Sequence, residues 1–76
     1  MLRYMRMDKD LVIGERVKKL RKRNDFMQEE FAEELGISRM TVSRIENGTT
    51  SLNMKILSKM SQVLQVSENE ILNSNK

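Results

Sequence analysis

Cysteine, histidine and proline are all absent from this 76-residue sequence. Without cysteine the chain can form neither disulfides nor thiolate metal sites. The absence of histidine removes the most common metal ligand and the usual general base near neutral pH. The remaining acidic side chains fall mostly on expected helix faces, with no glycine-rich loop or polar cleft around them. The composition therefore argues against an enzyme and gives no reason to expect a metal or another cofactor.

Long apolar runs are missing as well. No stretch approaches the ~20 residues that span a bilayer. The N-terminus carries Arg3 and Arg6 but lacks the apolar segment that follows them in a secretory signal. We therefore expect a cytoplasmic protein with no membrane contact, folded as one small domain that buries only ~60% of the surface of its unfolded chain.

Charge is distributed unevenly along the chain, although the net charge is only +3. Residues 1–24 contain nine basic and three acidic residues, whereas residues 25–36 contain five acidic residues and no basic one. A basic segment followed by an acidic one predicts a polarised surface. Such a run is ordinarily a solvated face, so its meaning depends on where the fold places it.

Apolar residues recur at helical spacing throughout the sequence, and no segment alternates as a strand would. Ile13, Val17 and Leu20 predict a first helix from about Asp10 to Asn24. The second helix is expected to run over residues 28–35, followed by a glycine suited to a left-handed helix end.

Three polar residues are placed to cap the remaining helices. Ser38 is expected to cap a third helix that ends at Gly48, and Asn53 a fourth. Ser67 and Glu70 match a capping box that begins a short fifth helix. In the fourth helix the residues predicted to face inward are Met54, Leu57, Met60, Val63 and Leu64.

The expected fold is an all-α domain of five short helices over residues 10–73. The seven methionines are expected to help fill its core, because an unbranched thioether adapts to irregular gaps. Residues 1–9 are expected to form a flexible N-terminal extension, with a basic arm that binds DNA as the alternative.

The second and third helices contain the pattern of a DNA-binding helix-turn-helix. Ala32 is small where the two helices approach, Gly36 forms the turn, and Val42 and Ile45 are apolar where the third helix packs back. Their spacings of four, six and three residues coincide with the expected caps and helix lengths.

Residues 13–72 resemble the phage repressor and Cro-like helix-turn-helix family, also called the xenobiotic-response-element (XRE) family. The most specific matches are the Q-x-x-x-A-x-x-x-G core and the segment SRIENG. The resemblance implies a lambda-repressor-like five-helix fold and a transcriptional regulator, with repressor the favoured role. Two positions depart from the family pattern: Met27 replaces the usual Thr or Ser before the glutamine, and Asp25 replaces a frequent glycine.

The resemblance also implies where DNA binds. The outer side of the third helix would enter the major groove and contact bases through Arg39, Met40, Thr41, Ser43 and Arg44. DNA phosphates would be contacted by Gln28, Ser38 and Asn47. Arg21 and Glu46 would form a structural ion pair that joins the first helix to the third.

The expected partner is double-stranded DNA with a near-palindromic operator, bound by a homodimer, with no small-molecule ligand. The dimer surface is expected around Val66, Ile71 and Leu72. The alternative function is an antitoxin or protein-interaction module on the same fold. DNA binding would weaken steeply as the salt concentration rises, which distinguishes the two functions.

Overall fold

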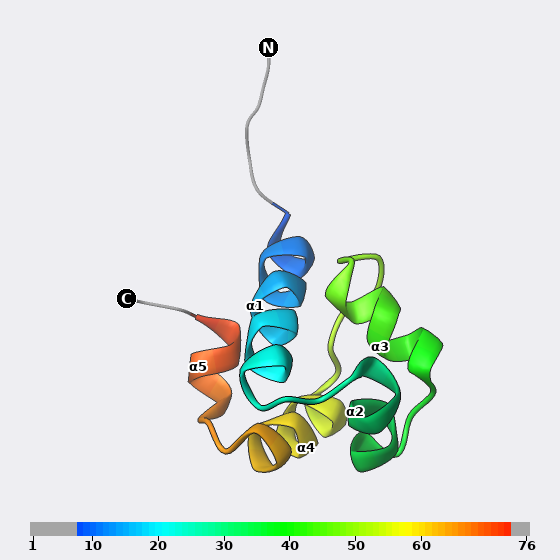
Figure 1. Ribbon diagram of the computed structural model, residues 1–76. Coiled ribbons are helices and arrows are strands. Elements are labelled where there is room, and N and C mark those ends of the chain that lie inside the picture. The colour runs from blue at the N-terminus through cyan, green and yellow to red at the C-terminus, as the bar shows by residue number, and fades with distance from the viewer. Residues whose placement is uncertain (1–7, 74–76) are drawn as a thin grey trace.

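Five helices make up the described part of the chain, residues 8–73 of a computed structural model (Figure 1). No strand occurs within these residues, so the predicted all-α, five-helix fold is confirmed. The helices are α1 (Lys9–Arg23), α2 (Gln28–Leu35), α3 (Arg39–Glu46), α4 (Met54–Leu64) and α5 (Glu68–Leu72).

The start of α1 differs slightly from the sequence prediction. Asp8 is the N-cap, and its carboxylate accepts a hydrogen bond from the backbone N–H of Asp10 at 2.8 Å. Asp8 and Lys9 therefore belong to the beginning of α1 rather than to a flexible extension. Residues 1–7, to which the rest of that prediction refers, lie outside the described residues.

The predicted N-caps of α3, α4 and α5 are confirmed. Each side-chain oxygen accepts a backbone N–H three residues on: Ser38 from Thr41 (3.1 Å), Asn53 from Ile56 (2.8 Å) and Ser67 from Glu70 (3.0 Å). At the start of α2, the carboxylate of Glu30 accepts from the N–H of Met27 at 2.8 Å, but the Met27 side chain caps nothing. Gly36 and Asp25 adopt the expected left-handed conformation, with φ of 73° and 63°.

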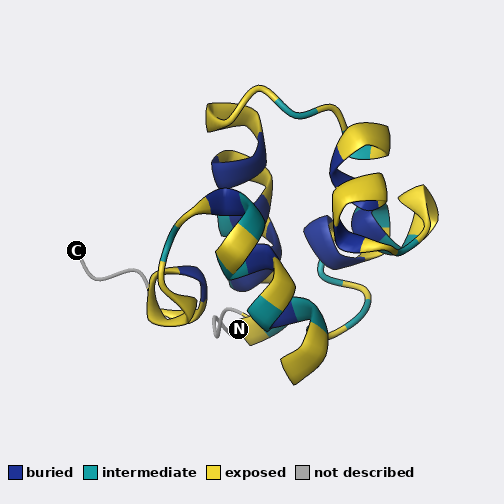
Figure 2. Cartoon of the chain, turned by 90° about the horizontal axis from the view of Figure 1, so that it is seen from below, coloured by how far each residue is buried: buried dark blue, intermediate teal, exposed yellow. Residues whose placement is uncertain are grey.

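The core lies where the buried faces of all five helices meet (Figure 2). Leu57, Met60 and Leu64 form the buried side of α4, as predicted, while Val63 is only half-buried. Met54 was predicted to face inward but is 78% exposed. It lies in the first turn of α4, about a quarter-turn from the centre of the buried stripe.

Two other predictions about apolar residues are wrong. Of the methionines within residues 8–73, only Met60 is buried, so methionine contributes little to the core; Met27 and Met54 are exposed, and Met40 is exposed as its predicted place on the outer side of α3 requires. Branched aliphatic and aromatic side chains fill the core instead. Ile71 was expected at an exposed dimer surface but is completely buried, because it is the residue through which the short α5 packs on the core.

Helices α1 and α3 approach closely at Gly14. A Cβ atom added to Gly14 would overlap the carbonyl oxygen of Ile45 and lie 2.8 Å from that of Glu46. Both neighbours are backbone atoms at the end of α3, so they cannot rotate away. The missing side chain thus allows α1 to lie directly against the C-terminal turn of α3.

A buried ion pair joins the same two helices. Arg21 donates from Nε to Oε2 of Glu46 at 2.6 Å and from Nη2 to Oε1 at 3.1 Å. Its remaining terminal nitrogen, Nη1, donates to the carbonyl oxygen of Phe26 at 2.7 Å. The side-chain nitrogen of Gln28 donates to Oε1 of Glu46 at 3.0 Å. One carboxylate therefore connects α1, the start of α2 and the end of α3.

We expect Glu46→Ala to lower the free energy of unfolding by about 3–5 kcal/mol, because it leaves the guanidinium of Arg21 buried without its partner. Urea denaturation followed by circular dichroism measures the change. Glu34→Ala, which removes an exposed glutamate, is the control and should change stability by no more than about 0.5 kcal/mol. An unfolding curve of Glu46→Ala that matches the wild-type curve would contradict this role.

Gly14→Ala should destabilise the protein, although alanine ordinarily stabilises a helix by about 1 kcal/mol relative to glycine. The added Cβ would force α1 away from the backbone of α3. Thermal denaturation tests the sign of the effect, with Lys18→Ala on the exposed face of α1 as the control. A higher melting temperature for Gly14→Ala would show that the two helices can separate without cost.

Candidate nucleic-acid interface

The turn between α2 and α3 is closed by backbone hydrogen bonds. The N–H of Ile37 donates to the carbonyl of Ala32 at 3.0 Å, and that of Gly36 to Glu33 at 3.2 Å. These bonds satisfy carbonyl groups at the end of α2 and require the left-handed conformation that Gly36 adopts. The chain then reaches Ser38, which begins α3. The geometry of this unit is thus set by its local sequence.

Helix α3 has one buried side and one exposed side. Val42 and Ile45 are 0% and 2% exposed and pack on the core. Arg39 and Arg44 are exposed. The only ion pair found within residues 8–73 is the one between Arg21 and Glu46, so both α3 guanidinium groups are unpaired there. The exposed side can therefore donate several hydrogen bonds to an external partner.

The other residues predicted to contact DNA occupy different environments. Met40 is 61% exposed, and Asn47 is exposed at the C-cap of α3. Ser43 and Thr41 are half-buried. The hydroxyls of Thr41 and Ser38 lie 2.8 Å apart, and the hydroxyl of Ser38 also caps α3. One of the two hydroxyl hydrogens is used within this pair, and the other remains free to donate.

Thr49 is a contributor that the sequence did not indicate. Its hydroxyl donates to the carbonyl oxygen of Arg44 at 3.2 Å, and its backbone N–H donates to the same oxygen at 3.0 Å. The C-terminal turn of α3 is thereby closed beside one of the two exposed arginines. A threonine just after Gly48 is a weak sequence signal, because only the folded turn brings its hydroxyl back to the helix.

The start of α2 lies next to the start of α3. A hollow of about 380 Å³ is lined by Arg21, Met27, Gln28, Glu29 and Arg39. Met27 forms no side-chain cap hydrogen bond, and a thioether sulfur is only a weak acceptor, so the first-turn amides of α2 have no strong side-chain acceptor. Unpaired amides at a helix start, together with the guanidinium of Arg39, form an environment that suits an anion.

Gln28 is held in place by a contact that the sequence did not predict. Its side-chain nitrogen donates to the buried carboxylate of Glu46 at 3.0 Å. The side chain is half-buried at the edge of the hollow. The ion pair between α1 and α3 therefore also positions a residue predicted to contact phosphate.

Two further features bear on the kind of site. No group of three or more acidic residues within residues 8–73 is arranged to hold a metal ion. None of the described helices has the length and apolar character needed to cross a membrane.

Comparison with known proteins identifies the helix-turn-helix formed by α2 and α3 as a known family unit. A helix-turn-helix family model matches residues 17–71. Over 65 residues the chain is 42% identical to the antitoxin PezA of Streptococcus pneumoniae serotype 4, and over 63 residues it is 38% identical to the transcriptional regulator SinR of Bacillus licheniformis. These matches cover 86% and 82% of the chain but 41% and 57% of the relatives. The chain thus spans about half the length of the curated relatives it matches.

Solved structures show the same fold. The P22 c2 repressor in complex with a synthetic operator superposes with a TM-score of 0.79 at 28% identity, covering 83% of this chain and 96% of that one. The restriction-modification controller protein C.AhdI of Aeromonas hydrophila also gives 0.79, covering 83% of this chain and 91% of its own, and its 24% identity supports the fold alone. The family match and these superpositions confirm the resemblance seen in residues 13–72: this chain belongs to the helix-turn-helix family, in its phage repressor and Cro-like (XRE) group.

Proposed function

We propose that this protein is a sequence-specific DNA-binding transcriptional regulator, acting as a repressor, whose α3 enters the major groove. The observation that carries the proposal is that Arg39 and Arg44 of α3 are both exposed and unpaired within residues 8–73. The operator-bound P22 c2 repressor, which has the same fold, supports it. The role is one of binding rather than catalysis, and it places the protein in the cytoplasm.

The exposed side of α3 supplies the chemistry of base recognition. A guanidinium can donate two hydrogen bonds to O6 and N7 of guanine, which suits Arg39 and Arg44. The thioether of Met40 and the methyl group of Thr41 are suited to contact with a thymine methyl. Ser43, which is half-buried on the same helix, can donate to a base.

Phosphate contacts would fix the orientation of α3 without reading sequence. The hollow beside Gln28 would receive one phosphate, bound by the open amides of α2. Ser38 and Asn47, at the two ends of α3, are exposed and would contact phosphates on either side of the groove. Because Glu46 holds Gln28, the register of the protein on DNA would depend on the buried ion pair.

A homodimer would place two α3 helices in successive major grooves of a near-palindromic operator, with half-sites about 34 Å apart. Val66, which is half-buried just before α5, and Leu72, which is exposed at the end of α5, remain candidates for the symmetric contact. The buried Ile71 does not.

A second candidate function is that of an antitoxin that binds a partner protein. The 42% identity to the antitoxin PezA favours it. The matched part is 41% of that relative, and it is the part that contains the helix-turn-helix. DNA binding by this part is therefore compatible with both functions.

Selection of bound sites from a random DNA pool tests the proposal. We expect enrichment of a near-palindromic motif, and affinity for it should fall steeply with salt because several phosphates are neutralised. A pool without an enriched motif, with binding that does not respond to salt, would reject the regulator and favour the protein-interaction function.

Arg44→Ala and Gln28→Ala should weaken DNA binding in different ways. Loss of a bidentate base contact should cost about 1–3 kcal/mol at one operator position and abolish discrimination there. Loss of Gln28 should weaken binding to all sequences about equally and leave discrimination unchanged. Fluorescence anisotropy with the selected operator and its single-base variants measures both.

Lys59→Ala is the control for these two variants, since it removes an exposed positive charge from α4, outside the helix-turn-helix. Its affinity and specificity should remain close to those of the wild type. If Arg44→Ala kept full discrimination at every operator position, Arg44 would be a phosphate contact or a solvated charge.

A further inference from the structure

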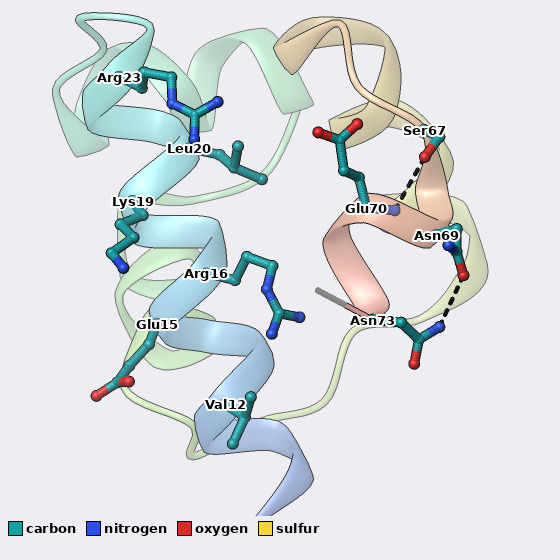
Figure 3. Close-up of a pocket in the computed structure, with 10 residues that line it drawn as sticks. All are labelled: Val12, Glu15, Arg16, Lys19, Leu20, Arg23, Ser67, Asn69, Glu70 and Asn73. Carbon is teal, nitrogen blue, oxygen red and sulfur yellow. Dashed lines mark hydrogen bonds between the residues drawn. The ribbon is translucent and has the colours of Figure 1, made fainter. Parts of the chain in front are cut away.

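A polar groove of about 560 Å³ separates α1 from α5 (Figure 3). Arg16, Lys19 and Arg23 line it from α1 at helical spacings of three and four residues, and Val12 and Leu20 line it from the same helix. The α5 side consists mainly of Ser67, Asn69, Glu70 and Asn73. Neither of the two helices that form the groove takes part in the helix-turn-helix.

The polar groups on the α5 side are largely satisfied within the protein. The side-chain nitrogen of Asn73 donates to the side-chain oxygen of Asn69 at 2.9 Å, and Ser67 caps α5. Arg16 donates from Nη1 to the carbonyl oxygen of Ile71 at 2.9 Å, which ties α1 to the end of α5. These contacts fix the wall of the groove.

The basic groups on the α1 side are different. Lys19 and Arg23 are exposed, and within residues 8–73 neither forms an ion pair or a side-chain hydrogen bond. Two carboxylates, those of Glu15 and Glu70, also line the groove and reduce its positive charge. The three basic residues still outnumber them, so the groove attracts negatively charged groups, and the mixed lining suits a protein surface better than a uniformly anionic polymer.

The same chain offers a surface of the opposite sign. Helix α2 buries Phe31, Ala32 and Leu35 and exposes four glutamates on its other side. These are Glu29, Glu30, Glu33 and Glu34. No ion pair joins any of them to a basic residue of the described part of the chain. Glu33 and Glu34 are farthest from the N-terminus of α2, where a phosphate would bind.

The two surfaces cannot meet within one molecule. Helix α2 packs on α3 and α4, whereas the groove lies between α1 and α5, and the two lie on opposite flanks of the fold (Figure 1). Complementary surfaces on opposite sides of one molecule form a head-to-tail contact, which extends along a row instead of closing into a symmetric pair.

We propose that the α1–α5 groove of one molecule receives the acidic side of α2 from a second copy of this chain, through Arg16, Lys19 and Arg23 on one side and Glu33 and Glu34 on the other. The contact is weak in free solution, because exposed ion pairs stabilise little and are screened by salt. When two molecules are held side by side, the effective concentration of the two surfaces is high, which favours the contact. Its consequence, cooperative occupation of neighbouring DNA sites, rests on the proposed function.

Two charge-reversal variants test the contact. Lys19→Glu/Arg23→Glu makes the groove acidic, and Glu33→Lys/Glu34→Lys makes the α2 surface basic. Sedimentation of the wild-type protein without DNA, at low salt and increasing concentration, should show association beyond a dimer that disappears at high salt. Each variant alone should lose this association by at least about tenfold in affinity.

Mixing the two variants is the decisive measurement. In the mixture, the acidic groove of one variant faces the basic α2 surface of the other variant. Association should therefore return, although neither variant associates alone. Lys55→Glu/Lys59→Glu carries the same change in net charge as the groove variant but lies on exposed positions of α4, and it should associate as the wild type does. Circular dichroism establishes that all variants are folded.

Three results would overturn the proposal: association of a variant alone at the wild-type level, a mixture that behaves as the sum of its parts, or a groove that binds a polyglutamate peptide while the protein does not self-associate. The last result would assign the groove to a different acidic partner. Since no DNA is present, none of these outcomes depends on whether the protein recognises an operator.

Discussion

The contact between Arg21 and Glu46 determines how three of the five helices are arranged. Both side chains are almost completely buried, so their desolvation must be offset by the hydrogen bonds they make. Glu46 accepts from Arg21 twice and from Gln28 once, and Arg21 also donates to the carbonyl of Phe26. A pair with so many directional partners contributes mainly orientation, because the attraction between the charges largely compensates the cost of burying them.

The arrangement of α3 follows from this contact together with the close approach at Gly14. Backbone packing at Gly14 and the ion pair one to two turns further along α1 hold the C-terminal half of α3 at two points. In this orientation of α3, Val42 and Ile45 are buried in the core, whereas the two arginines of α3 are exposed. The side of α3 that we propose contacts bases is exposed because the other side carries the buried residues of the helix.

The errors of the sequence prediction lie where the local signal in the sequence is weak or ambiguous. Met54 has the hydrophobicity of a core residue, but the flexible side chain of methionine carries little information about which face of a short helix is covered. Ile71 was assigned to a surface because a five-residue helix shows too little periodicity to separate inside from outside. The displaced start of α1 reflects two aspartates, Asp8 and Asp10, either of which can cap a helix.

The sequence alone determined the elements and the helix-turn-helix, because caps, glycine turns and apolar spacing are local signals that each helix satisfies within a few residues. It also identified the residues that belong to α3 and the order of charges along the chain. Only the tertiary structure decided that Gln28 is held by Glu46, that Thr49 closes α3, and that the basic and acidic surfaces lie on opposite flanks. These features depend on distances between segments far apart or folded back on themselves, and no local pattern of residues encodes such distances.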